Sequence, residues 1–468
     1  MEGSLWGILH RFTCNWSLGN LPESMVEEAA ARRRTIERTV IVVLSSCYVA
    51  LLLTSLKHVD SVMFGFLGIA FDPPDPSWYY LSMAMAVLPS FWMTCTIERP
   101  SQVAYWILYL TVIVPSMLVP FHVSTRTPDE VLVSTATLLF SFFLLGVITR
   151  LPRVKFSRAV LSEEAFIVAL SVGLLSLALV IWSFNGFQID LGLTGIYDRR
   201  LAAREIVTQR SAIGYLTGNF ASSLVPLGVV YGFVRKNKLV LGLGLLGSLV
   251  LFSVEGSRSS ALLPLFVFML YPLLTKFRLR FGILVLCGLL MILGTSVLAF
   301  VLYEYFQISM IVSWRLLLIK GLLSTHYWDF FSSNEHVYMS DGIMRFFLQP
   351  QYDVTTPRLI GQTFFNPDNN ANANIWAAAF SDFGYAGVIG VTVVAGVILR
   401  FIDSLAASRG FLICALMCGF IGFKWSDVAL DTSILTHGTL LTLIVLYLLP
   451  QKTERQSNEP ADSAQVAS

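Results

Sequence analysis

Long runs of apolar residues, separated by short polar breaks, make up most of the chain between residues 39 and 450. An α-helix needs about 20 mostly apolar residues to cross the hydrocarbon of a membrane, and many of these runs approach that length. The pattern therefore predicts an all-α polytopic membrane protein with about twelve transmembrane helices. We place these spans near residues 39–56, 79–96, 102–120, 131–149, 166–185, 213–234, 239–254, 260–275, 281–303, 372–399, 410–423 and 433–449.

The two ends of the chain are more polar than the region between them. Residues 1–38 form an N-terminal arm that includes Arg32, Arg33 and Arg34. Residues 451–468 form a polar tail, which we expect to be disordered because it has little apolar surface to bury. We therefore divide the chain into an arm, a transmembrane domain over residues 39–450, and a tail.

The composition supports a membrane protein and excludes one class of partner. Of the 468 residues, 55% are hydrophobic and 13% are charged, and the mean hydropathy is +0.69. A soluble domain carries roughly 25% charged residues. The net charge of +2 gives no sign of nucleic-acid binding. No cysteine lies in the long polar loops, so disulfide bonds are not expected to stabilise them.

The orientation follows from the distribution of basic residues, because loops rich in Lys and Arg stay in the cytoplasm. Three short loops are strongly basic; they contain Arg150, Arg153, Lys155 and Arg158, then Arg235, Lys236 and Lys238, then Lys276, Arg278 and Arg280. This predicts that both termini are cytoplasmic. Two long segments, about 186–212 and 304–371, then lie on the outer side, and we expect the second to form short helices at the membrane surface.

The two long outer segments contain many arginines, although the topology rule disfavours arginine there. The residues concerned are Arg199, Arg200, Arg204, Arg345 and Arg358, and Arg258 lies in a tight outer turn between two spans. On a helix, Arg200 and Arg204 would share one face. Guanidinium groups can pair bidentately with phosphate oxygens, so these six residues are candidate diphosphate ligands. The alternative is contact with lipid headgroups or with Asp198, Glu205 and Glu255.

Three sequence segments resemble a known family. They are Tyr197-Asp198-Arg199-Arg200-x3-Arg204 with Gly214-Tyr215-Leu216, then Gly256-Ser257-Arg258, then Asn372-Ala373-Asn374-Ile375-Trp376 running to Phe383-Gly384-Tyr385-Ala386-Gly387. In these segments, and in span pattern over roughly residues 40–450, the chain resembles the O-antigen and oligosaccharide repeat-unit polymerases (Wzy type). Asn374, Gly384 and Gly387 also fit the spacing of a motif of the related O-antigen ligases, but Ala373 stands where those ligases have histidine.

The resemblance implies a glycosyltransferase of the bacterial inner membrane that works at the periplasmic face. It would polymerise undecaprenyl-diphosphate-linked oligosaccharides into O-antigen or a related polysaccharide, and undecaprenyl diphosphate would be the leaving group. Membrane lipids, a chain-length regulator (Wzz type) and the repeat-unit flippase are the expected partners. We expect no cofactor and no metal, since arginines can take the place of a divalent cation and the first outer loop has no Asp-x-Asp.

A general base for the acceptor hydroxyl should be a carboxylate or a histidine. Asp382 is a candidate because it lies inside a predicted span, where ionisable residues are often functional, although a polar contact between helices would also explain it. The long second loop offers His326, Asp329, Glu335 and His336, each of which could also be an ordinary loop residue.

Two rival functions remain open at this point. An O-antigen ligase or another lipid-linked glycosyltransferase would have the same fold class, but Ala373 and the missing Asp-x-Asp argue against it. About twelve spans also suit a secondary transporter. Transporters place their charges near the middle of the membrane and often contain internal repeats, whereas here the charges lie in outer loops and no repeat is evident.

Overall fold

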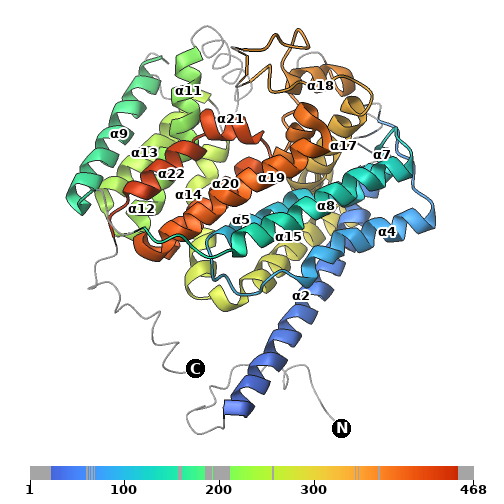
Figure 1. Ribbon diagram of the computed structural model, residues 1–468, viewed down its shortest axis with the longest axis horizontal. Coiled ribbons are helices and arrows are strands. Elements are labelled where there is room, and N and C mark those ends of the chain that lie inside the picture. The colour runs from blue at the N-terminus through green and yellow to red at the C-terminus, as the bar shows by residue number, and fades with distance from the viewer. Residues whose placement is uncertain are drawn as a thin grey trace.

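The computed structural model describes residues 23–59, 62, 64, 67, 69–156, 161–184, 192, 211–255, 258–342, 344–345, 347–366 and 369–451. Within these residues every regular element is a helix (Figure 1). The protein is therefore all-helical, as the pattern of apolar runs predicts.

The first half of the chain contributes helices up to residue 255. They are α2 (Glu23–Val59), α4 (Pro76–Val87), the 3-10 helix η3 (Leu88–Phe91), α5 (Ser101–Leu108), the π-helix η4 (Tyr109–Ile113), α6 (Val114–Leu118), α7 (Pro120–Val123), α8 (Pro128–Arg150), α9 (Glu163–Phe184), α11 (Ser211–Asn219), the π-helix η5 (Phe220–Leu224), α12 (Val225–Val234) and α13 (Lys238–Glu255).

The second half contains the remaining helices. They are α14 (Arg258–Thr275), the 3-10 helix η6 (Arg278–Arg280), α15 (Phe281–Tyr303), α16 (Phe306–Ser309), the π-helix η7 (Met310–Leu318), α17 (Ile319–Phe331), α18 (Thr356–Phe364), α19 (Ile375–Arg409), α20 (Phe411–Trp425), α21 (Leu430–Leu435) and α22 (Thr439–Leu448).

Eight helices of the described chain are long and apolar enough to cross a membrane, so the protein is membrane-embedded. They cover residues 31–59, 101–123, 128–150, 163–183, 214–234, 278–303, 306–331 and 375–409. Seven of them coincide with predicted spans. Four further predicted spans correspond to apolar helices of 10–17 residues.

Two predictions at the level of the spans differ from the structure. The predicted span 79–96 is not one long helix, because Pro89 lies in η3 and regular helix ends there. The predicted outer loop 304–371 begins with an apolar helical run over Phe306–Phe331 that is long enough to span a membrane. The chain reverses into this run through Glu304, whose φ is +52°, directly after α15.

The loops of the bundle gather at two ends. At the first, which we call the basic end, segments 94–101, 149–154, 278–282 and 400–409 contact one another. The Arg278 side chain donates to the Ile97 carbonyl, Arg400 donates to the Pro152 carbonyl, and Ser101 donates to the buried carboxylate of Asp403. Two of these segments, 149–154 and 278–282, belong to loops that the charge pattern assigns to a single side.

At the opposite end, which we call the acidic end, segments 124–127, 329–342, 355–374 and 428–437 come together. The α8 and α19 helices run in parallel between the two ends, since Ser134 contacts Tyr385 and Val154 contacts Ser404. Figure 1 shows α17, α18 and the start of α19 grouped beside α7. The helices α9, α12 and α13 form the other side of the molecule.

Candidate functional site

A cavity of about 250 Å³ opens at the acidic end. Five parts of the chain line it: α17 through Tyr327, residues 341–342, the start of α18, the start of α19 with the residues before it, and α21 with the turn before it. Its lining is mostly polar, with Tyr327, Asp341, Gly342, Thr355, Thr356, Pro357, Asn372, Ala373, Ala378, Ser381, Asp382, Val428, Ala429, Asp431 and Thr432. Ligand sites for drug-sized molecules are typically ~300–1,000 Å³. This cavity therefore suits about one sugar ring.

A break in α19 positions Asp382 at this cavity. Directly after Asp382, Phe383 has φ −140° and ψ 20°, and Gly384 has φ +59° and ψ −144°. The second conformation is essentially restricted to glycine. A broken helix leaves carbonyl oxygens without their usual partners. Here the Ser381 and Asp382 carbonyls accept from the backbone N–H groups of Val337 and Tyr338, at 2.9 and 3.3 Å.

The segment Val337–Met339 also holds the Asp382 side chain. The backbone N–H of Met339 donates to Asp382 Oδ1 at 2.9 Å. Tyr338 and Met339 both have positive φ, 55° and 57°, which is uncommon for residues other than glycine. Strained backbone of this kind persists where the surrounding structure enforces it and often occurs at functional sites.

Two more aspartates line the cavity. Asp341 Oδ2 accepts hydrogen bonds from the backbone N–H and the hydroxyl of Thr356, both at 2.7 Å, and so anchors the first turn of α18. Asp431 lies in α21, and its carboxylate faces Gly342. Burial raises the pKa of Asp431, and the nearby Asp341 carboxylate raises it further. Three carboxylates from three distant parts of the chain therefore surround one space.

Sequence reasoning identified only Asp382 among these three. Asp382 was found because it interrupts an apolar run. Asp341 and Asp431 lie in polar connections, where an aspartate is ordinary. No sequence signal that we know of would have distinguished them from the other acidic residues of the same segments.

The motif around residue 373 lies at the N-terminus of α19. Ala373 lines the cavity and is almost fully buried. Asn374 caps the helix, because its side-chain oxygen accepts from the backbone N–H groups of Trp376 and Ala377 at 3.1 Å. Its amide also donates to the Ser324 hydroxyl in α17. Asn374 therefore fixes the start of α19, and residue 373 borders the space that Asp382 borders.

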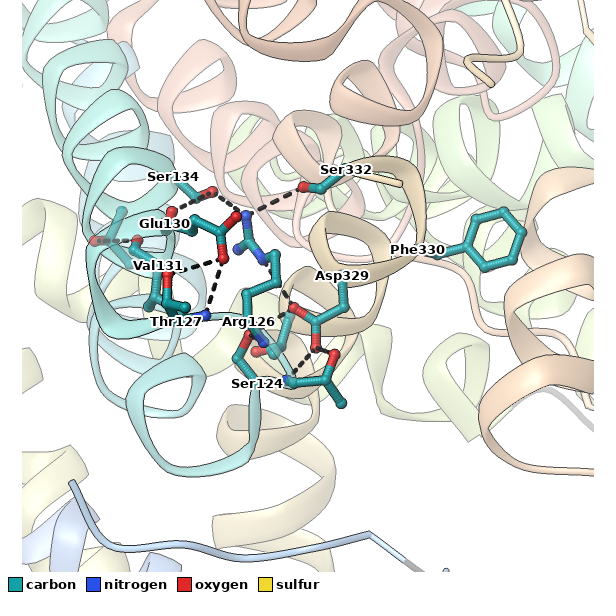
Figure 2. Close-up of polar contacts among 12 residues, drawn as sticks. Ser124, Arg126, Thr127, Glu130, Val131, Ser134, Asp329, Phe330 and Ser332 are labelled. Carbon is teal, nitrogen blue, oxygen red and sulfur yellow. Dashed lines mark hydrogen bonds and ion pairs between the residues drawn. The ribbon is translucent and has the colours of Figure 1, made fainter. Parts of the chain in front are cut away.

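Asp329 lies outside the cavity lining, in a dense polar contact (Figure 2). Its carboxylate forms a buried ion pair with Arg126 at 3.0 Å and accepts from the Ser124 hydroxyl at 2.6 Å and the Thr125 backbone N–H at 3.0 Å. Arg126 also donates to Ser134 and Ser332. The contact joins the end of α17 to the turn before α8. These donors occupy the carboxylate of Asp329, so its geometry fits a structural contact better than proton transfer.

The three remaining base candidates also lie near the acidic end but outside the cavity lining. His326 is buried and stacks on Phe364, with ring centroids 4.2 Å apart. Glu335 is exposed, and its backbone carbonyl accepts from the Tyr352 hydroxyl. His336 packs edge-on against Phe380, close to Gly384. Asp382 alone of the five candidates borders the cavity.

Two of the predicted diphosphate ligands lie in the described chain with their side chains. Arg358 is exposed in the first turn of α18, next to Pro357 of the cavity lining. Arg345 is exposed three residues after Gly342, which also lines the cavity. Arg199, Arg200 and Arg204 lie outside the described residues. Arg258 begins α14, but its side chain is not described.

An ion pair between a buried lysine and an exposed aspartate lies beside the cavity at this end. Lys320 of α17 is 6% exposed and pairs with Asp427, which lies in the turn between α20 and α21. That turn carries Val428 and Ala429 of the cavity lining. Because Lys320 is buried and paired, it is not available to an outer ligand. Within the part of the chain that the structure describes, no group of three or more His, Cys, Asp or Glu side chains is arranged to hold a metal ion.

The chain was compared with known proteins at the level of sequence and structure. No protein-family model matches it, and no curated protein and no solved structure gives a match.

Proposed function

We propose that this protein joins undecaprenyl-diphosphate-linked oligosaccharide repeat units into O-antigen or a related surface polysaccharide. One observation carries the proposal: a small polar cavity with a carboxylate at a helix break lies between two segments that each present an exposed arginine, Arg345 and Arg358. A carboxylate can accept hydrogen bonds from the hydroxyls of an acceptor sugar and can take up the proton of the attacking one. Guanidinium groups can pair with the oxygens of a diphosphate.

The reaction is a glycosyl transfer without a metal. A hydroxyl oxygen of the acceptor attacks the anomeric carbon of the donor sugar, and the bond from that carbon to the diphosphate oxygen breaks. The electron pair of the broken bond leaves with undecaprenyl diphosphate. Asp382 takes the proton of the attacking hydroxyl. Arg345 and Arg358, together with Arg199, Arg200, Arg204 and Arg258 of the other outer segments, stabilise the charge on the leaving group.

The acidic end faces the periplasm, and the basic end and both termini face the cytoplasm of a bacterium, in its inner membrane. The donor and the acceptor approach through the membrane as lipid-linked oligosaccharides. A chain-length regulator and the repeat-unit flippase are the protein partners that such a task requires.

A secondary transporter is the second candidate, because α19 is a broken helix with an aspartate at the break. Transporters use broken helices to build binding sites near the middle of the membrane. In this protein the break lies close to the start of α19, beside the loops of the acidic end. This position favours chemistry at one face of the membrane over transport through its centre.

An O-antigen ligase is a further alternative within the same class of enzyme. It would use the same donor and would differ in its acceptor.

The experiment is lipopolysaccharide gel analysis of a strain that lacks this gene. We expect the long ladder to collapse to core plus a single repeat unit, and the wild-type gene to restore it. Loss of all attached O-antigen would indicate a ligase, and an unchanged ladder would indicate a transporter; either result would contradict the proposal.

A further inference from the structure

A second cavity lies at the basic end, on the opposite side of the bundle from the carboxylates. Its volume is about 210 Å³. Segments 92–106 and 146–150 form its lining, which includes Trp92, Arg99, Tyr105, Trp106 and Arg150. The proposed glycosyl transfer uses none of these residues. We propose that this cavity binds the phosphate headgroup of a membrane phospholipid, independently of the function proposed above.

Two guanidinium groups give the cavity its ligand preference. Arg99 Nη1 donates to the carbonyls of Thr149 and Leu151, at 2.5 and 2.9 Å, and Arg150 Nη2 donates to the Trp92 carbonyl at 2.8 Å. An arginine has five N–H donors. These contacts hold the two side chains in place at the cavity and leave further donors on each for a ligand. A phosphate offers several oxygens that match such paired donors.

The one carboxylate of the lining does not cancel this charge. Glu98 is exposed, and it lies close enough to Arg278 for an electrostatic interaction. The Glu98 carbonyl also accepts from Arg153. Arg278 therefore offsets part of the Glu98 charge, and within the lining Arg99 and Arg150 outnumber this one carboxylate.

The surface beside the cavity fits acyl chains, which argues for a lipid and against free phosphate. On α8, Phe143 and Val147 are one turn apart and both exposed, and Leu151 follows one turn later. Trp92 of the cavity packs edge-on against Phe143, and the adjacent Phe91 is 56% exposed. An apolar strip thus begins where the cavity opens. Tryptophans such as Trp92 are enriched at the level of lipid headgroups.

Three matched probes test the phosphate and the lipid separately on the purified wild-type protein in detergent. They are phosphatidylglycerol, a diacylglycerol with the same acyl chains, and soluble glycerol phosphate. We expect phosphatidylglycerol to raise the thermal unfolding midpoint and to remain bound in native mass spectrometry, because a ligand of the folded state stabilises it. Equal binding of the diacylglycerol would refute the phosphate contact. Equal binding of glycerol phosphate would show that the acyl chains contribute nothing, and would refute a lipid as the ligand.

A variant locates the binding site. In Arg150→Gln we expect the affinity for phosphatidylglycerol to fall on the order of tenfold or more, since a charge-assisted hydrogen bond is lost. The affinity of Arg150→Lys for phosphatidylglycerol should lie between that of wild type and that of Arg150→Gln. Arg400→Gln is the matched control, because Arg400 lies at the same end and also donates to a main-chain carbonyl but does not line the cavity. Unchanged affinity in both Arg150 variants, or an equal loss in Arg400→Gln, would overturn the proposal.

Discussion

The three aspartates of the acidic end share one cavity but have different hydrogen-bond donors. Asp341 is held by both the backbone and the hydroxyl of Thr356, so it stabilises the start of α18. Asp382 accepts one backbone N–H, from Met339. A carboxylate with few donors keeps free lone pairs for a substrate proton. Compared with Asp341, Asp382 therefore has the arrangement better suited to act as the base.

Asp431 should make stability depend on pH. Its pKa is raised above 3.8 in the folded protein, chiefly by burial. A carboxyl whose folded pKa is raised contributes stability that is complete below its unfolded pKa and is lost as the pH rises through the folded pKa. In Asp431→Asn this loss is absent. We therefore expect the thermal midpoint of the variant, relative to wild type, to increase between pH 4 and pH 7. A difference that is constant or decreases over this range would contradict the buried position of Asp431.

At the scale of elements, the break in α19 is the feature on which the site depends. Gly384→Ala should destabilise the protein by about 1–3 kcal/mol, because its backbone conformation is strained for other residues. In addition, a Cβ there would lie 3.1 Å from His336 Nε2. Thermal or denaturant unfolding of the purified variant measures the effect.

Gly390 provides the matched control for Gly384, because it lies in the same helix and a Cβ there would meet nothing within 4 Å. We expect Gly390→Ala to be neutral or to stabilise the helix by roughly 0.5–1 kcal/mol. If Gly384→Ala behaved like Gly390→Ala, the break would not require glycine, and the fixed position of Asp382 would lose its explanation.

Helices were predictable from sequence where apolar runs were long and uninterrupted, as in α8 and α15. They were less predictable where proline or glycine altered the helix. Pro115 and Pro226 lack a backbone N–H, and each lies at the start of the helix that follows a π-helical segment, η4 or η5. The helix Phe306–Phe331 was predicted as part of an outer loop, because the stretch is rich in aromatic residues and contains Arg315 and Lys320. The bend at Gly384 depends on its φ and ψ values, which the residue types in this segment do not reveal.

At the scale of the whole molecule, basic loops from separate parts of the chain meet at one end of the bundle, and the acidic-end cavity lies at the other. Loops that carry Arg99, Arg150, Arg278 and Arg400 meet at the basic end, and the long segment after α17 lies at the other. The cavity itself combines residues such as Tyr327, Asp341 and Asp431 that are remote in sequence. Their proximity arises from the packing of α17, α19 and α21, which a single sequence does not reveal.

We propose that the acidic-end cavity performs glycosyl transfer between lipid-linked repeat units. The direct test gives purified protein in lipid vesicles undecaprenyl-diphosphate-linked repeat units and measures product length on gels. Wild type should form chains of many repeats. Asp382→Asn should be slower by ~10²–10⁴-fold, the usual contribution of a general base. Asp353→Asn should match wild type, because Asp353 is exposed in the same segment and does not line the cavity. The absence of chains from wild type, or wild-type rates from Asp382→Asn, would contradict glycosyl transfer at this cavity with Asp382 as the base.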